Sequence, residues 1–126
     1  MTIHTEGRHA AEHIVSEANG TRSREVITLC AGNQLPAGAV LAKLTTGPNQ
    51  GKYTALDPSN TDADGTNVAA AVLFAGVDAT TADRPAVITA RDSEVKAVAL
   101  GWRTGVTTEQ KATALAELAA LGIVAR

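Results

Sequence analysis

The sequence predicts a small, mainly β domain over residues 24–126, with one helix near its C-terminal end and an extended arm over residues 1–23. The first observation is a series of short apolar runs between residues 35 and 100, separated by glycine, proline, asparagine and aspartate. Short apolar runs bounded by turn residues are typical of strands. The second observation is a change to helical spacing after residue 107, and the third is the polar, weakly patterned character of the arm.

Strands are expected at the apolar runs, with turn-rich loops between them. The expected strands are residues 24–30, 39–45, 52–56, 68–77, 86–90 and 94–100, the last two joined as a hairpin around residues 91–93. Residues 68–77 form the most apolar run and are hydrophobic on both faces, which indicates a central strand or a strand at a subunit contact. The residues expected in the core or in a subunit contact are Val68, Val72, Phe74 and Trp102.

A helix is predicted over residues 108–121. Thr107 and Gln110 have the spacing of a capping box, in which each side chain bonds the backbone N–H of the other residue. The expected apolar stripe of this helix is Ala112, Leu115, Leu118 and Ala119. Gly122 fits the left-handed position that follows a helix, where Ile123 folds back onto the last turn. The short apolar tail after Gly122 is expected to pack or to pair with a strand.

Residues 1–23 are expected to form an arm that is loosely held in the free protein. Its only sizeable hydrophobic side chains are Ile3, Ile14 and Val15, so it has no apolar face to fix it to a core. A short helix around residues 8–16 would be marginal in water, and Asn19–Gly20 is a turn signal. A partner is therefore expected to order this arm.

Composition and charge exclude several classes of protein. The formal net charge is −2, no basic run occurs, and the three aromatic residues are scattered, so nucleic-acid binding is disfavoured. No apolar run approaches the roughly 18 residues needed to span a bilayer, and no membrane partner is expected. The first residues lack the basic and apolar regions of a secretory signal.

Small residues dominate the sequence, and this predicts association. Alanine makes up roughly a fifth of the chain, and alanine buries little area per residue. A monomer would therefore have a thin core, for which oligomerisation is a common remedy. Cys30 is the only cysteine and lies in an apolar run, which indicates a buried small hydrophobic residue rather than a reactive thiol.

One motif resembles a catalytic site. His9, Glu12 and His13 match the H-x-x-E-H signature of some zinc peptidases, and His4 offers a third imidazole. On a helix the two histidines would lie one turn apart and could share a zinc ion, with Glu12 as general base. Such a site also needs a rigid helix and a second shell of supporting residues. The arm has no apolar face to provide them, so the sequence favours a protein without a cofactor that is not an enzyme.

Several stretches, taken in order, carry a resemblance to a known family. They are residues 5–9, 19–25, 35–41, 51–58, 65–73, 91–95 and 115–123, which include TEGRH, NGTRSRE, LPAGAVL, GKYTALDP and LAELAALGI. Together they resemble the head decoration proteins of tailed bacteriophages, the lambda-like D family. The resemblance covers most of the chain, and it depends on the joint order and spacing of these stretches.

This resemblance implies a β-clip type fold and a structural role in a virion. It implies homotrimers on the outer surface of the expanded phage head, at local threefold positions, that cement the shell against internal DNA pressure. Such a protein would be made in the host cytoplasm, and its partner would be the major capsid protein. In the family the arm adds a strand to an extended loop of that protein. The arm residues expected at the capsid are Ile3, His4, Thr5, Glu6, Arg8 and His9.

Two other functions remain open from the residues. The first is a virion-displayed module that binds a receptor or host surface, with residues 48–51 and 58–65 as its contact loops. The second is a small zinc hydrolase that uses His9, Glu12 and His13. Stoichiometric zinc that disappears in the His9→Ala variant would support the hydrolase.

Overall fold

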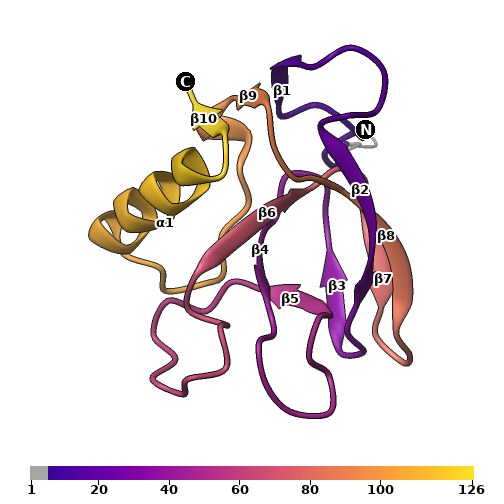
Figure 1. Cartoon of the computed structure of the whole chain (residues 1–126), viewed down its shortest axis with the longest axis vertical. Coiled ribbons are helices and arrows are strands. Elements are labelled where there is room, and N and C mark those ends of the chain that lie inside the picture. The colour runs from indigo at the N-terminus through magenta and orange to yellow at the C-terminus, as the bar shows by residue number, and fades with distance from the viewer. Residues whose placement is uncertain (1–5) are drawn as a thin grey trace, which may run out of the picture.

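The computed structural model describes residues 6–126 as a mainly β protein with one α-helix, α1 (Thr108–Ala120), as Figure 1 shows. The strands are β1 (Ile14–Glu17), β2 (Arg24–Leu29), β3 (Asn33–Leu35), β4 (Val40–Lys43), β5 (Tyr53–Ala55), β6 (Ala69–Leu73), β7 (Val77–Ala79), β8 (Arg84–Thr89), β9 (Ser93–Val95) and β10 (Ile123–Ala125). A short 3-10 helix, η1 (Ala97–Ala99), follows β9. The prediction of a small β domain with one C-terminal helix is confirmed.

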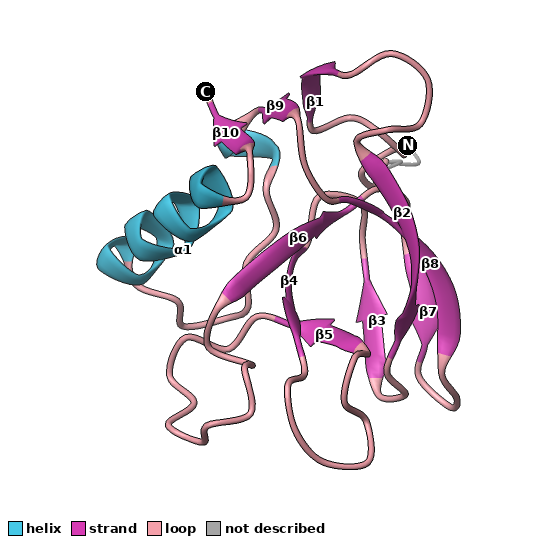
Figure 2. Cartoon of the chain, viewed as in Figure 1, coloured by secondary structure: helices cyan, strands magenta, loops and turns pink. Residues whose placement is uncertain are grey.

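Five strands close into a barrel in the order β2, β5, β4, β6 and β8 (Figure 2). The longest pairing joins β2 to β8 in antiparallel register from Arg24 opposite Thr89 to Leu29 opposite Arg84. The closing contact is a short parallel bridge between Leu29 of β2 and Tyr53 of β5. Closure leaves no free edge on these strands, which removes the usual route to edge-to-edge aggregation.

Alternation along the central strands explains two adjoining hydrophobic clusters. In β4, Val40 and Ala42 belong to one cluster and Leu41 belongs to the other. In β6, Val72 lies with the first cluster and Leu73 with the second, as a period of two residues requires. The second cluster draws on all five barrel strands, and the first joins the barrel to α1, β9 and β10.

The helix begins and ends as its sequence predicts. The Thr107 hydroxyl accepts a bond from the Gln110 N–H at 3.1 Å, and the Gln110 side chain accepts one from the Thr107 N–H at 2.9 Å. Gly122 has φ +88°, and Ile123 is fully buried in the same cluster as Leu118. The buried side of the helix is formed by Ala114 and Leu118, with Leu115 half-buried, whereas Ala112 and Ala119 are exposed.

Two strand predictions are wrong. Residues 86–90 and 94–100 do not form a hairpin, because β8 pairs with β2 and β6 in the barrel while β9 pairs with β1 and β10. The long strand expected over residues 68–77 is two strands, β6 and β7, separated by a bend, and β7 pairs with β3. Both errors concern pairing between distant residues, which a local apolar pattern does not encode.

The folded part of the chain begins well before residue 24. Strand β1 pairs antiparallel with β9, and β10 pairs parallel with the other side of β9. The Ser23 hydroxyl is fully buried, accepts a bond from the Ala18 N–H and donates one to the Asp92 carbonyl, both at 2.9 Å. The expected border between arm and domain at residue 23 therefore differs from the structure, in which residues 13–23 belong to the folded body.

Within residues 6–126, no helix is both long and apolar enough to cross a membrane.

Candidate functional site

Both ends of the described chain lie at the same end of the molecule (Figure 1). The three-stranded sheet of β1, β9 and β10 lies there, and the loops that follow β4 and β5 lie at the opposite end (Figure 1). We call the former the β1 end, made up of residues 6–13, this sheet and η1. It contains Glu6, Arg8 and His9, the described residues for which the resemblance predicts contact with the capsid.

Residues 6–12 lie on the surface of the β1 end with few bonds to the barrel. The His9 ring nitrogen Nε2 lies 3.3 Å from a carboxylate oxygen of Glu6, and the His9 N–H donates to the Glu12 carboxylate at 3.2 Å. The Ala11 N–H donates to the carbonyl of Phe74 at 3.0 Å. This segment presents charged side chains to solvent and is fixed to the body mainly at its end.

His13 is the residue that fixes this segment. Its side chain is 1% exposed, and its ring nitrogen Nε2 lies 3.0 Å from the hydroxyl of Thr89 in β8. Its ring stands edge-on to Phe74 with centroids 6.3 Å apart, and its carbonyl accepts a bond from the Lys96 N–H at 2.7 Å. One buried imidazole therefore connects the start of β1 to the barrel.

Burial lowers the pKa of His13 from 6.5 to about 4, which Glu17 partly opposes and Arg8 reinforces. The other ring nitrogen, Nδ1, is buried without a hydrogen-bond partner among the described residues. The imidazole is therefore neutral at physiological pH, since protonation would place a charge and an unpaired N–H in a dry site.

The zinc motif does not form a zinc site in this arrangement. Residues 10–13 form a turn, with φ +62° at Ala11, in place of the helix that the motif requires. His9 is exposed, whereas His13 is buried against Thr89. Across residues 6–126, no group of three histidine, cysteine, aspartate or glutamate side chains is placed to hold a metal ion.

An apolar surface adjoins the segment that precedes β1. Val98 in η1 is 90% exposed, and a shallow hollow beside it is lined by Trp102 and Leu115. The Lys111 ammonium lies 5.9 Å from the centre of the Trp102 ring. We call this surface the Val98 patch, composed of Ala97, Val98, Leu100, Trp102, Lys111 and Leu115.

Val98 also faces the N-terminal segment. A second hollow, lined by Arg8, Glu12, Lys96, Val98 and Ala99, joins the Val98 patch to that segment. Arg8 approaches Gly38, since a Cβ placed on that glycine would lie 3.7 Å from its guanidinium. The patch and the segment are therefore parts of one continuous surface.

The structure places the residues predicted for the core, for a subunit contact and for the capsid contact in different surroundings. Val72 is fully buried, Trp102 is half-buried against the same cluster, and Phe74 lies near His13. Val68 is 48% exposed just ahead of β6, so it lies outside the core of the single chain, and its place in a subunit contact stays a prediction. Glu6, Arg8 and His9 are exposed near one another, whereas Ile3, His4 and Thr5 lie outside the described residues.

Sequence reasoning missed Val98 and the burial of His13. A signal existed for Val98, because strand alternation over residues 94–100 would place it on the same face as Glu94 and Lys96. A large apolar side chain on a charged face is a candidate for an interface. No local signal marks His13, because its apolar surroundings come from Phe74 and from strands far along the chain.

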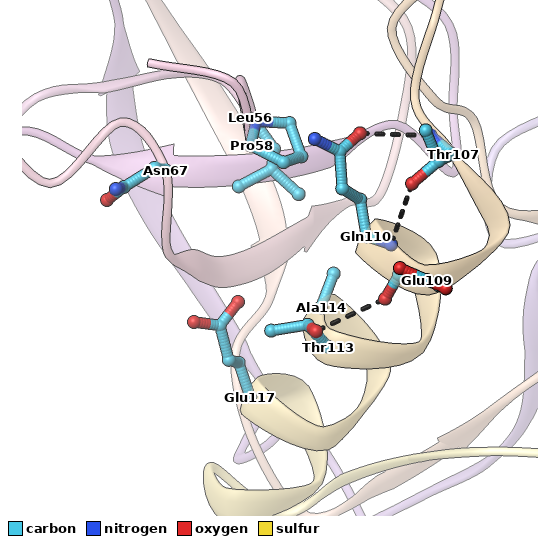
Figure 3. Close-up of a pocket in the computed structure, with 9 residues that line it drawn as sticks. All are labelled: Leu56, Pro58, Asn67, Thr107, Glu109, Gln110, Thr113, Ala114 and Glu117. Carbon is cyan, nitrogen blue, oxygen red and sulfur yellow. Dashed lines mark hydrogen bonds between the residues drawn. The ribbon is translucent and has the colours of Figure 1, made fainter. Parts of the chain in front are cut away.

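A further hollow lies between α1 and the loop before β6, and its polar groups have structural roles (Figure 3). Gln110 completes the capping box and also donates to the Ser59 hydroxyl at 3.3 Å. The Glu117 carboxylate accepts a bond from the Ala69 N–H at 3.1 Å, which fixes β6 to the helix. These contacts give Gln110 and Glu117 structural roles in this hollow.

Cys30 is buried in the barrel wall, as the sequence predicts. Its side chain is 7% exposed, and its N–H donates to the carbonyl of Tyr53 at 2.9 Å. Burial raises the pKa of its thiol, with a further contribution from Asp83. The residue thus acts as a small apolar wall residue rather than as a nucleophile.

No curated protein sequence matches the chain. The sequence matches the family described as bacteriophage lambda head decoration protein D over residues 3–123 of 126. Since the match covers nearly the whole chain, it supports a structural role in capsid decoration and a place in the phage virion. The chain belongs to the bacteriophage lambda head decoration protein D family.

Proposed function

We propose that the chain binds the outer surface of the expanded phage head as a homotrimer and stabilises the shell against the pressure of packaged DNA. The observation that carries the proposal is the family match over residues 3–123, combined with an exposed segment ahead of β1 at one end of the body. The β1 end faces the shell in this proposal. The opposite end, which carries the loops after β4 and β5 and which we call the loop end, faces solvent.

The segment ahead of β1 supplies the contact to the major capsid protein. Residues 6–10 are exposed and include Glu6, Arg8 and His9. A strand that this segment adds to an extended loop of the capsid protein would gain main-chain hydrogen bonds for affinity and side-chain contacts for specificity.

The Val98 patch supplies the contact between subunits. Val98 is 90% exposed and lies beside the half-buried Trp102. When a second copy covers Val98, its apolar surface is removed from water, which favours association. Tryptophan is enriched among the residues that dominate binding energy at interfaces. Trimer formation would also add buried area to a fold whose clusters contain many alanines.

Trimers strengthen a shell through repeated weak contacts. Each trimer presents three copies of the segment ahead of β1, so that the second and third attachments are intramolecular and benefit from a high effective concentration. A trimer bound across neighbouring capsomers resists their separation when internal pressure rises.

Deletion of residues 1–10 tests the attachment. The shortened protein keeps His13, β1 and Ser23, so it is expected to fold and to trimerise, yet to lose binding to expanded shells in a cosedimentation assay. The matched control replaces the exposed residues 61–63, at the loop end, with serine and is expected to bind like the parent protein. Full binding by the deletion variant would contradict attachment through this segment.

A further inference from the structure

The buried imidazole of His13 occupies the junction between the N-terminal segment and the barrel. On one side the backbone continues from His13 directly into β1, and the Ala11 N–H nearby bonds the Phe74 carbonyl at 3.0 Å. On the other side its ring bonds Thr89, which is fully buried and paired with Arg24 and Val72 in the barrel. The ring of His13 is thus a buried contact between the N-terminal segment and the barrel.

The charged groups around the ring belong to several elements. They are Arg8 and Glu12 ahead of β1, Glu17 on β1, Arg24 on β2 and Lys96 after β9. Arg24 pairs with Glu17 and stacks over Phe74, with its guanidinium carbon 4.1 Å from the ring centre. The Glu17 carboxylate is therefore already partnered by Arg24, and no carboxylate within residues 6–126 bonds the His13 ring.

Neutral and protonated forms of the ring fit this site very differently. In the Nε2–H tautomer the neutral ring donates one hydrogen bond to Thr89, and Nδ1 is the ring nitrogen left without a partner among residues 6–126. A proton on Nδ1 would add a positive charge and a donor without an acceptor among the described residues. Water becomes available to the charged ring only when His13 leaves the barrel.

We infer that His13 is an acid-sensitive latch, whose protonation releases residues 6–17 from the barrel while the barrel itself stays folded. The inference rests on the contacts of His13 in the free chain. Its consequence for capsid attachment, a larger exposed segment at low pH, rests on the proposed function.

Linkage gives the direction and size of the effect. In the released state the imidazole has its ordinary pKa of 6.5, whereas in the closed state burial lowers the pKa to about 4. The released state therefore binds more protons between these values, and the closed state loses stability as the pH falls. The equilibrium constant for release is expected to rise by about a hundredfold between pH 7 and pH 4, and to be nearly constant above pH 7.

Hydrogen exchange of the free protein tests the latch. Amide exchange in β1 and β9, corrected for intrinsic rates, is expected to show the hundredfold rise in the equilibrium constant for opening of the parent protein. The His9→Gln variant is the control and is expected to show the same rise, because the His9 side chain is exposed. In His13→Gln, a neutral side chain that can still bond Thr89 replaces the imidazole, and the rise is expected to disappear. The Glu17–Arg24 ion pair is present in all three proteins, so their difference isolates His13.

Two further measurements on the parent protein keep the inference falsifiable if His13→Gln fails to fold. Amides of β6 are expected to stay protected at pH 4, and opening of β6 together with β1 would mean global unfolding and would overturn the latch. The His13 ring signal in NMR spectra is expected to protonate over the pH range in which β1 opens. Protonation of the ring while β1 stays closed would also overturn it. Because no capsid is present, this failure is distinct from a failure of the proposed attachment.

Discussion

Gly38 lies where two backbone segments approach closely. It has φ +89°, and a Cβ placed on it would lie 2.5 Å from the carbonyl oxygen of Ala99. Its own N–H bonds the Leu73 carbonyl, and its carbonyl accepts a bond from Gly101, both at 2.8 Å. Gly38 therefore links β6 to the segment after η1, and only glycine provides both the conformation and the space.

Replacement of Gly38 by alanine is expected to destabilise the protein strongly. The left-handed conformation costs a non-glycine residue about 1–2 kcal/mol, and the clash with a backbone carbonyl adds roughly 1–3 kcal/mol. Gly32→Ala is the matched control, because Gly32 has a similar φ of +94° with nothing within 4 Å of its added Cβ. Urea denaturation should show a larger loss of unfolding free energy for Gly38→Ala, and equal losses would contradict the close approach.

At the scale of elements, α1 is the one whose ends are specified most completely by neighbouring residues. The capping box of Thr107 and Gln110 satisfies two backbone N–H groups at its start, and Gly122 turns the chain at its end. The helix then directs Ala114 and Leu118 into the cluster shared with the barrel. Local chemistry fixes the element, and its apolar side fixes where it packs.

The cap provides a prediction at this scale. Thr107→Ala removes the side-chain acceptor for the Gln110 N–H and is expected to lower the unfolding free energy by about 1 kcal/mol. Thr104→Ala, at an exposed position in the preceding turn, is the control and is expected to change it by less than about 0.5 kcal/mol. The comparison requires thermal or urea denaturation of both variants, and equal effects would mean that the box contributes nothing.

Strand β9 shows how an element of three residues can organise one end of the molecule. It pairs with β1 on one side and with β10 on the other, so it joins residues near the two ends of the chain. Arg126 pairs with Glu94, and the Ser16 hydroxyl donates to the same carboxyl group at 3.0 Å. These contacts hold the pKa of Glu94 below its usual range, with Arg126 as the largest cause.

At the scale of the whole molecule, the closed barrel and the three-stranded sheet contribute side chains to one hydrophobic cluster but present different surfaces. The loop end is polar, and the β1 end joins the exposed segment of residues 6–12 to the Val98 patch. If this patch joins subunits, the copies of that segment lie close to the trimer contacts, where one trimer can hold several capsid subunits.

Two substitutions by aspartate test the proposed trimer contact. Val98→Asp is expected to convert the trimer to a monomer in size-exclusion chromatography with light scattering, because a buried unpaired carboxylate is costly. Val26→Asp is the control, since Val26 is 74% exposed on β2, outside the patch, and this variant is expected to remain trimeric. A trimer that tolerates Val98→Asp but not Val26→Asp would place the contact on β2.

The sequence predicts elements much better than their partners. The apolar runs identify β2, β4, β5 and β8 to within a few residues, and the continuous apolar run that begins at Val68 predicts that β6 is buried on both faces. It misassigns the neighbours of β9, because Ile14 and Ile123 reach that strand from opposite ends of the chain. A three-residue strand carries too little pattern to specify a partner at such a distance.

Some residues of the candidate site can likewise be predicted from the sequence, and others cannot. Exposed charged residues such as Arg8 and His9 can be predicted from a polar segment that lacks an apolar face. The burial of His13 cannot be predicted in this way, because its pocket is built from Phe74 and Thr89, more than 60 residues further along the sequence. The Val98 patch likewise forms only when η1 and α1 come together.

The sequence by itself therefore determines the family, the β character, the capped helix and the lack of an apolar face in the first residues. These properties depend on the order of short stretches and on contacts within a few residues. Tertiary structure alone decides the closure of the barrel, the pairing of β1 with β9, the latch position of His13 and the exposure of Val98. Each of these depends on the free energy of contacts between distant residues, which exists only after the chain has folded.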